Sequence, residues 1–159
     1  MMHLAELNIA RLKHDADDAR VAPFMDALDR INAIAERSQG FQWRYVDDSG
    51  NATDTRVSND PRLIVNLSVW DGVTNLETFV WGTIHRQFYR RRAEWFRILD
   101  RMHFAMWWVK PGVTPSVDEA LERLAHLNQH GDTDRAFGWA HLAEANRWRS
   151  AQCGDVAAG

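Results

Sequence analysis

Four residues near the middle of the chain have types and spacing that suit acid–base chemistry. Trp81, His85, Tyr89 and Arg92 follow one another at helical intervals, so they would lie on one face of a helix. Histidine titrates near neutral pH and serves as a general base or a metal ligand, and arginine holds anionic groups. This face therefore suits a small-molecule pocket with His85 as the base and Arg92 as the anion-holding group.

A structural role for the same face is equally compatible with the sequence. In that interpretation His85 donates a hydrogen bond to a backbone carbonyl, and Arg92 pairs with Glu94 or Asp100. The residue pattern alone leaves both interpretations open.

A second polar set lies on two segments that alternate with the period of a strand, residues 3–12 and 63–70. Glu6 and Asn8 share one face of the first segment, and Asn66 and Ser68 share one face of the second. An unpaired polar group in the middle of a sheet costs about 1–3 kcal/mol. These side chains therefore predict either a wet cavity or a dimer interface.

The remaining elements complete a β-α-β, β-α-β, α-β order. We expect helices from Pro23 to near Gly40, from Thr74 (capped with Glu77) to Phe96 and from Thr114 to Gly131, strands at 41–46, 104–109 and 136–142, and a mobile loop at 47–61. Two split units of this kind form a ferredoxin-like α+β fold, an antiparallel sheet with helices on one face, in which segments 3–12 and 63–70 are central neighbours. The uncovered face predicts a homodimer.

Composition restricts the class of protein. A chain of 159 residues with net charge −3 predicts one domain, here residues 1–145 with a disordered tail at 146–159, and argues against nucleic-acid binding. There is one cysteine, Cys153, and we expect neither a membrane segment nor a signal peptide, which predicts a cytoplasmic protein. Glu122, His126 and His130 share a helix face, but a solvated face explains them better than a metal site, so none is predicted.

Several segments resemble a known family. They are Leu4–Asn8, Gly40–Arg44, His85–Phe96, Trp107–Gly112 and Ala136–Phe137. Together they are similar to a bacterial domain-of-unknown-function family, number 3291, of the dimeric α+β barrel superfamily, beside the antibiotic-biosynthesis monooxygenases. The resemblance implies the ferredoxin-like fold and a barrel built from two chains. The resemblance does not assign an activity or a catalytic role to any residue of this sequence.

The wider superfamily suggests a small-molecule enzyme of the antibiotic-biosynthesis-monooxygenase type, acting in natural product biosynthesis without a cofactor. The substrate would be aromatic or polyketide-like and would lie between the second helix and the sheet. His85 would take a proton, Asn8 or Asn66 would donate to the oxyanion, and Arg92 would hold an anionic group. The expected substrate-binding residues are Glu6, Trp43, Asn66, Ser68, Trp81, Tyr89, Trp107 and Trp108.

Two alternatives remain open. Haem-degrading relatives in the superfamily pair an asparagine with a tryptophan and a histidine, and Asn8, Trp81 and His85 would fill those positions, although the tryptophan and the histidine are closer in this sequence. The barrel would also serve a protein that binds a ligand or scaffolds a partner without catalysis.

Overall fold

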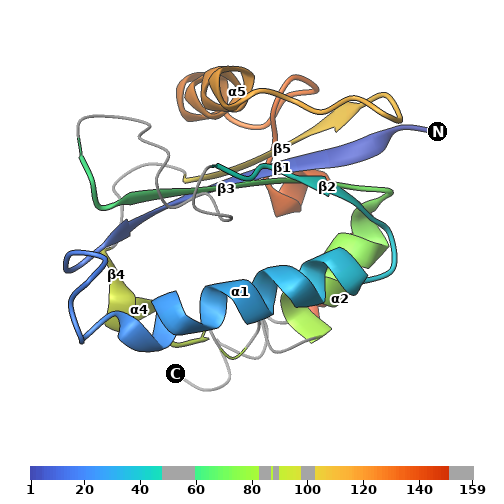
Figure 1. Ribbon diagram of the computed structural model, residues 1–159. Helices are drawn as coiled ribbons and strands as arrows, with labels where there is room; N and C mark the ends of the chain where they lie inside the picture. Colours follow the sequence, from blue (N-terminus) through green and yellow to red (C-terminus); the bar gives the residue numbers. More distant parts are fainter. Residues whose placement is uncertain (48–59, 83–86, 88–89, 98–102, 151–159) are drawn as a thin grey trace.

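The computed structural model describes residues 1–47, 60–82, 87, 90–97 and 103–150 (Figure 1). In chain order its elements are β1 (His3–Leu12), α1 (Ala22–Arg37), β2 (Phe41–Arg44), β3 (Leu63–Trp70), α2 (Val73–Gly82), α4 (Arg92–Trp95), β4 (Phe96–Arg97), β5 (Phe104–Val109), α5 (Val117–His130) and the short 3₁₀ helix η1 (Trp139–His141). Within these residues no helix is both long and apolar enough to cross a membrane.

The strands form one antiparallel sheet with β1 and β3 at its centre. β2 lies outside β3, and β5 and the short β4 pair with successive parts of the other side of β1. This is the strand order of the ferredoxin-like fold, so the predicted α+β class with β1 beside β3 is confirmed. The bounds of β1, β3 and β5 also agree with the prediction from residue alternation.

The central part of one face of the sheet is apolar and packs against α5. Alternate residues of β1, β3 and β5, such as Leu7, Leu67 and Trp107, form a cluster there with Leu124 and Leu127 of α5. Serine at position 116 starts this helix by accepting a hydrogen bond from the backbone N–H of Glu119, 3.1 Å away. The apolar stripe of α5 therefore covers this face.

Helices thus lie on both sides of the sheet, with α5 on one side and α1 and α2 on the other (Figure 1). The prediction of helices on one face only is wrong, because the sequence does not show which layer an amphipathic helix joins. The homodimer was inferred from an uncovered sheet face. It stays a prediction, and α5 removes the argument that led to it.

The face toward α1 and α2 carries two separate apolar clusters. One joins Leu4 and Trp70 to Ile31 of α1 and to Leu76 and Phe79 of α2. The second cluster lies at the far end of β1 and joins Leu12, Val21 and Trp95. Between these clusters the two central strands carry the polar residues Glu6, Asn8, Asn66 and Ser68.

The turn after α1 is tied closely to the start of α2. Gly40 has a φ of +85°, and its carbonyl accepts a hydrogen bond of 2.8 Å from the backbone N–H of Asp71. A Cβ atom at position 40 would overlap Asp71 Oδ1 and lie 2.5 Å from the side chain of Asn75. A glycine is therefore required here both for its backbone conformation and for space.

The helix predicted from Thr74 to Phe96 differs at both ends. α2 begins at Val73, and Asp71 accepts a hydrogen bond from the side-chain amide of Asn75. At the other end Arg91 lies in a turn and Phe96 belongs to β4, so one helix does not run through to Phe96. The helical spacing of polar and aromatic residues continues past Arg91 in the sequence. The sequence pattern therefore did not show that the helix is interrupted there.

The chain after α5 differs from the prediction as well. The strand expected at 136–142 is reduced to one bridge between Phe137 and Met106, followed by η1. Residues 146–150 form a helical turn, and Trp148 packs against the apolar cluster of α1 and α2, so a disordered tail does not begin at 146. Most of the loop predicted at 47–61, and the last residues from 151, lie outside the described residues.

Candidate functional site

The polar band on the α1 and α2 side of the sheet comes from directly paired residues of β1 and β3. In the strand register Glu6 is opposite Ser68, and Asn8 is opposite Asn66. Because partners in antiparallel strands point their side chains to the same face, all four meet between the two apolar clusters. The predicted placement of the two pairs on neighbouring strands is therefore confirmed, whereas their roles in binding and catalysis stay predictions.

A chain of hydrogen bonds runs through the buried part of this band. Trp70 Nε1 donates to Ser68 Oγ over 3.0 Å, and Ser68 Oγ donates to Glu6 Oε1 over 2.6 Å. All three residues are buried, Trp70 almost completely. The indole and hydroxyl are thus fixed in direction, and they fix one oxygen of the Glu6 carboxyl.

The carboxyl of Glu6 has unusual acidity. Burial raises the pKa of Glu6 from its ordinary value of 4.5 to about 7, and the hydrogen bond from Ser68 opposes this rise. Near neutral pH both the acid and the carboxylate are consequently populated. A group poised in this way can accept a proton and return it, which general acid–base catalysis requires.

Solvent reaches the band beyond Glu6 at Asn66. Asn66 is exposed although it lies on the covered side of the sheet, and Asn8 is half-buried. The side-chain oxygen Oδ1 of Asn8 is buried and has no hydrogen-bond partner within the part of the chain that the structure describes. An acceptor left in this state is ready for the N–H or O–H group of a ligand.

An aromatic pair borders the band on its β5 side. Phe104 is opposite Asn8 in the β1–β5 register, so the two side chains share the face of the site. The ring of Trp139, from η1, stacks on Phe104 with the ring centres 5.6 Å apart and the planes 12° apart. Both rings are half-buried.

The other predicted tryptophans divide between the two faces. Trp81 is buried on α2, and Trp108 is opposite Leu4 on the same face as the polar band. Trp43 and Trp107 pair with residues of the opposite face and pack in the cluster beneath α5. Neither residue therefore lines the polar band, because neighbouring positions along a strand point to opposite faces, and their role in substrate binding stays a prediction.

The predicted helix site is described only in part. His85 and Tyr89 lie outside the described residues, so their roles as base and lining residue stay predictions. Arg92 is exposed at the start of α4. Its neighbour Arg91 pairs with Glu94 at 2.9 Å and lies over the ring of Trp95.

The histidines of α5 do not form part of the band. His126 Nε2 lies 3.0 Å from Thr133 Oγ1, and His126 is half-buried, although we expected water to solvate it. Glu122 and His130 are exposed, as expected. Desolvation, helped by neighbouring positive groups, lowers the pKa of His126. Among the described residues no group of three or more His, Cys, Asp or Glu side chains could hold a metal ion.

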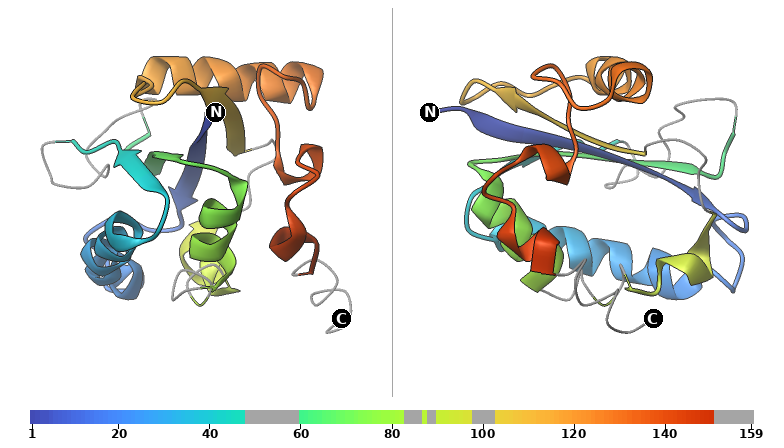
Figure 2. Two further views of the ribbon diagram at one scale, coloured as in Figure 1. Left: turned by 90° about the vertical axis from the view of Figure 1, so that its right-hand side faces the viewer. Right: turned by 180° about the vertical axis from the view of Figure 1, so that it is seen from behind.

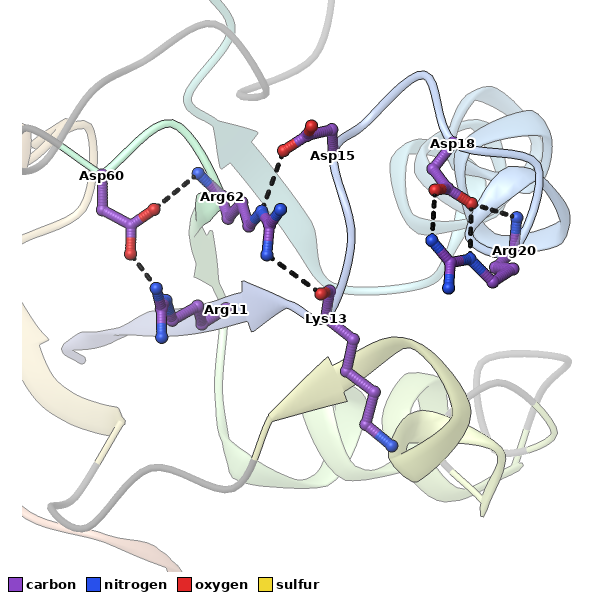
Figure 3. A network of polar contacts seen from close by, with 7 residues as sticks. All are labelled: Arg11, Lys13, Asp15, Asp18, Arg20, Asp60 and Arg62. Carbon is purple, nitrogen blue, oxygen red and sulfur yellow. Dashed lines mark hydrogen bonds and ion pairs between the residues drawn. The ribbon is translucent and has the colours of Figure 1, made fainter.

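A charged network holds the far end of β1 (Figure 3). Arg11 pairs with Asp60 at 2.6 Å, and Arg62 pairs with Asp15 at 2.9 Å and donates to the carbonyl of Lys13. These contacts tie the segment before β3 to the end of β1. The network therefore fixes the two central strands at the end remote from Glu6 and Ser68.

The sequence matches one protein family over nearly its whole length. Residues 3–153 match the family described as Domain of unknown function (DUF3291). The chain belongs to the DUF3291 family. No curated protein matches this DUF3291 chain in sequence.

Three solved structures are similar in chain arrangement. A protein of unknown function from Nitrosomonas europaea is 12% identical, with a TM-score of 0.47 over 73% of this chain and 95% of its own. A Pseudomonas aeruginosa protein is 12% identical, with a TM-score of 0.46 over 71% and 97%. A provisionally assigned antibiotic biosynthesis monooxygenase from Chloroflexus aurantiacus is 15% identical, with a TM-score of 0.43 over 72% and 98%. None of these similarities assigns a role to a residue of this DUF3291 chain.

Sequence reasoning missed three residues that border the candidate site of this DUF3291 chain. Trp70, Phe104 and Trp139 were not among the predicted site residues, although each is now placed by register or by ring stacking. The position of Trp70, two residues after Ser68 on one strand face, was the available signal. Nothing local to η1 indicated that Trp139 would reach Phe104.

Proposed function

We propose that the protein is a small-molecule enzyme in which Glu6 transfers a proton at the polar band between β1, β3 and the helices. The observation that carries this proposal is the buried hydrogen-bond chain from Trp70 through Ser68 to Glu6, with the pKa of Glu6 near 7. Natural proteins bury a carboxyl group without a charged partner only rarely. Such groups are concentrated at sites that use them.

The chemistry of the neighbours favours a substrate with an acidic O–H group, such as a phenol or an enol. The O–H group would donate to Asn8 Oδ1 on binding, because this acceptor is buried and has no partner among the described residues. Glu6, on the same face of β1, would then accept this proton as its hydrogen bond to Asn8 Oδ1 breaks, which leaves the substrate as an oxyanion and Glu6 as the neutral acid. Asn66, which solvent reaches, would donate its amide N–H to the oxyanion that forms.

Proton removal makes an aromatic or polyketide-like substrate electron-rich. Such an anion is able to react with dioxygen as co-substrate or to attack a carbonyl group within the same molecule. The proposal therefore covers an oxygenase and a cyclase with the same first step, and this first step assigns Glu6 the role earlier predicted for His85.

The experiment uses 1,3-dihydroxynaphthalene as the probe, with dioxygen uptake and product formation measured at neutral pH. Wild type should turn the probe over, and Glu6→Gln should lose about 10²–10⁴-fold in rate, because general-base catalysis contributes that much. Glu122→Gln, on the exposed face of α5, is the matched control and should keep the wild-type rate.

Two outcomes would count against the proposal. Equal turnover by wild type and Glu6→Gln would remove Glu6 as the base. Binding of the probe in a Glu6-dependent manner without any chemical change would make the protein a ligand-binding protein rather than an enzyme.

A further inference from the structure

The segment after α5 contributes to the site although it starts on the opposite side of the sheet. Figure 2 shows this segment, in orange to red, passing from the α5 side to the side of α2. It crosses at β5, where the backbone groups of Phe137 and Met106 exchange hydrogen bonds of 2.9 and 2.8 Å. Trp139 follows directly and reaches the face that carries Glu6 and Asn8.

The position of Trp139 is fixed from both ends of this segment. On one side is the Phe137 bridge to β5. On the other, the carboxyl oxygen Oε1 of Glu77, a buried residue of α2, accepts a hydrogen bond of 3.0 Å from the backbone N–H of Trp148. The segment that carries Trp139 is therefore attached to the fold on both sides, and the Trp139 ring contacts Phe104.

We infer that the Phe104–Trp139 stack is the ring-recognition element of the site and that Trp139 determines specificity for a planar aromatic ligand. This inference rests on the proposed function. Phe104 lies beside Asn8, so a ligand whose hydroxyl group donates to Asn8 Oδ1 places its ring against the aromatic pair. Both rings keep exposed surface, which is the surface that a planar ligand covers.

A planar aromatic ring stacks on this pair, and a saturated ring of similar size does not. The hydroxyl group fixes the ligand at Asn8 and Glu6, and the ring selects among ligands that carry such a group. Trp139 is consequently a residue that discriminates ligands while Glu6 performs the proton transfer.

The test measures binding of 2-naphthol and of decahydro-2-naphthol by calorimetry. The two probes share the hydroxyl group and the ring skeleton, and only 2-naphthol is planar. Wild type should bind 2-naphthol roughly tenfold more tightly, within the range found for stacking on aromatic side chains. Trp139→Leu should lose most of this preference, and Trp139→Phe should restore it.

Trp43→Leu is the matched control, because Trp43 is a half-buried tryptophan on the opposite face of the sheet. It should keep the wild-type preference for 2-naphthol. Circular dichroism and thermal unfolding confirm that each variant is folded before binding is compared.

The outcomes separate this inference from the proposed function. If Glu6→Gln and Asn8→Leu weaken 2-naphthol binding but Trp139→Leu leaves the preference for the planar probe unchanged, the inference is wrong and the proposed function stands. If wild type binds neither probe at millimolar concentration, or binds both equally, ring recognition at this site is likewise refuted. If 2-naphthol binding depends on Trp139 but not on Glu6 or Asn8, the proposed function fails and the aromatic site remains.

Discussion

Ser68 Oγ lies 2.6 Å from Glu6 Oε1, and the two residues are direct partners in the β1–β3 register. The contact joins two buried polar side chains at the centre of the sheet, where apolar pairs are usual. It directs a hydroxyl proton at a carboxyl group whose pKa burial has raised to about 7. The raised pKa of Glu6 is therefore the basis of the proposed proton transfer, and its effects on stability and on titration can be measured.

The stability of the protein should decrease as the pH rises through neutrality because of Glu6. The folded-state pKa of Glu6 is about 7, above the ordinary value of 4.5, so the folded state holds its proton over this interval. The contribution is fully present below pH 4.5 and is lost as the pH rises through 7. As the pH rises from about 5 to about 8, the unfolding free energy of Glu6→Gln should thus increase by about 2–3 kcal/mol relative to that of wild type.

Urea denaturation across this pH range measures the gain. Glu122→Gln, an exposed position on α5, is the control and should follow the wild-type curve. A Glu6→Gln curve parallel to that of wild type at every pH would mean that Glu6 titrates as an ordinary surface carboxyl.

Replacing Ser68 by alanine should raise the pKa of Glu6 further. The hydrogen bond from Ser68 stabilises the carboxylate, so its loss favours the protonated acid. Trp70 Nε1 also loses its acceptor, and the variant should unfold with about 1–3 kcal/mol less free energy. Thr78→Ala removes an exposed hydroxyl of α2 and serves as the control; a fall in the Glu6 pKa in Ser68→Ala would reverse the proposed direction of the bond.

Gly40→Ala should be more destabilising than Gly112→Ala. Both glycines have φ near +85°, so each substitution pays the backbone strain of a left-handed residue, about 1–3 kcal/mol. Only at Gly40 does the new Cβ also meet Asp71 and Asn75, whereas the space around Gly112 is open. Thermal unfolding should show the larger loss for Gly40→Ala, and equal losses would show that the turn moves away from α2 without cost.

Glu77→Ala should loosen the chain that follows η1. The buried carboxyl accepts the hydrogen bond of the Trp148 backbone N–H, and alanine leaves this N–H without its acceptor. The amide of Trp148 should exchange with solvent faster by roughly tenfold, in line with a loss of about 1–2 kcal/mol of local stability. Glu144→Ala, at an exposed position of the same segment, should leave this exchange rate unchanged.

The sequence predicted the centre of the fold better than its periphery. Alternation alone located β1 and β3, and residue parity within each strand predicted that Glu6 and Asn8 would meet Ser68 and Asn66. These features depend on neighbours along the chain. The pKa of Glu6 did not follow from parity, because it depends on how completely α1, α2 and the sheet exclude water.

The errors concern relations between distant segments. The sequence did not show that Trp43 and Trp107 lie on the face toward α5, because the register of β2 and β5 against the central strands is set by tertiary pairing. The alternating residues around Phe137 predicted a strand, but only Phe137 bridges β5 before η1 begins. For the same reason the stack of Trp139 on Phe104, which joins residues 35 positions apart in the chain, had no local signal.

The most direct test of the account is a titration of the Glu6 carboxyl in the wild-type protein. Carbon-13 NMR of glutamate-labelled protein follows each side-chain carboxyl with pH, and the spectrum of Glu6→Gln identifies the Glu6 resonance by its absence. We predict a midpoint near pH 7 for this resonance. A midpoint at or below the ordinary value of 4.5 would show that Glu6 is ionised throughout the neutral range and would contradict its role as a proton-transferring group.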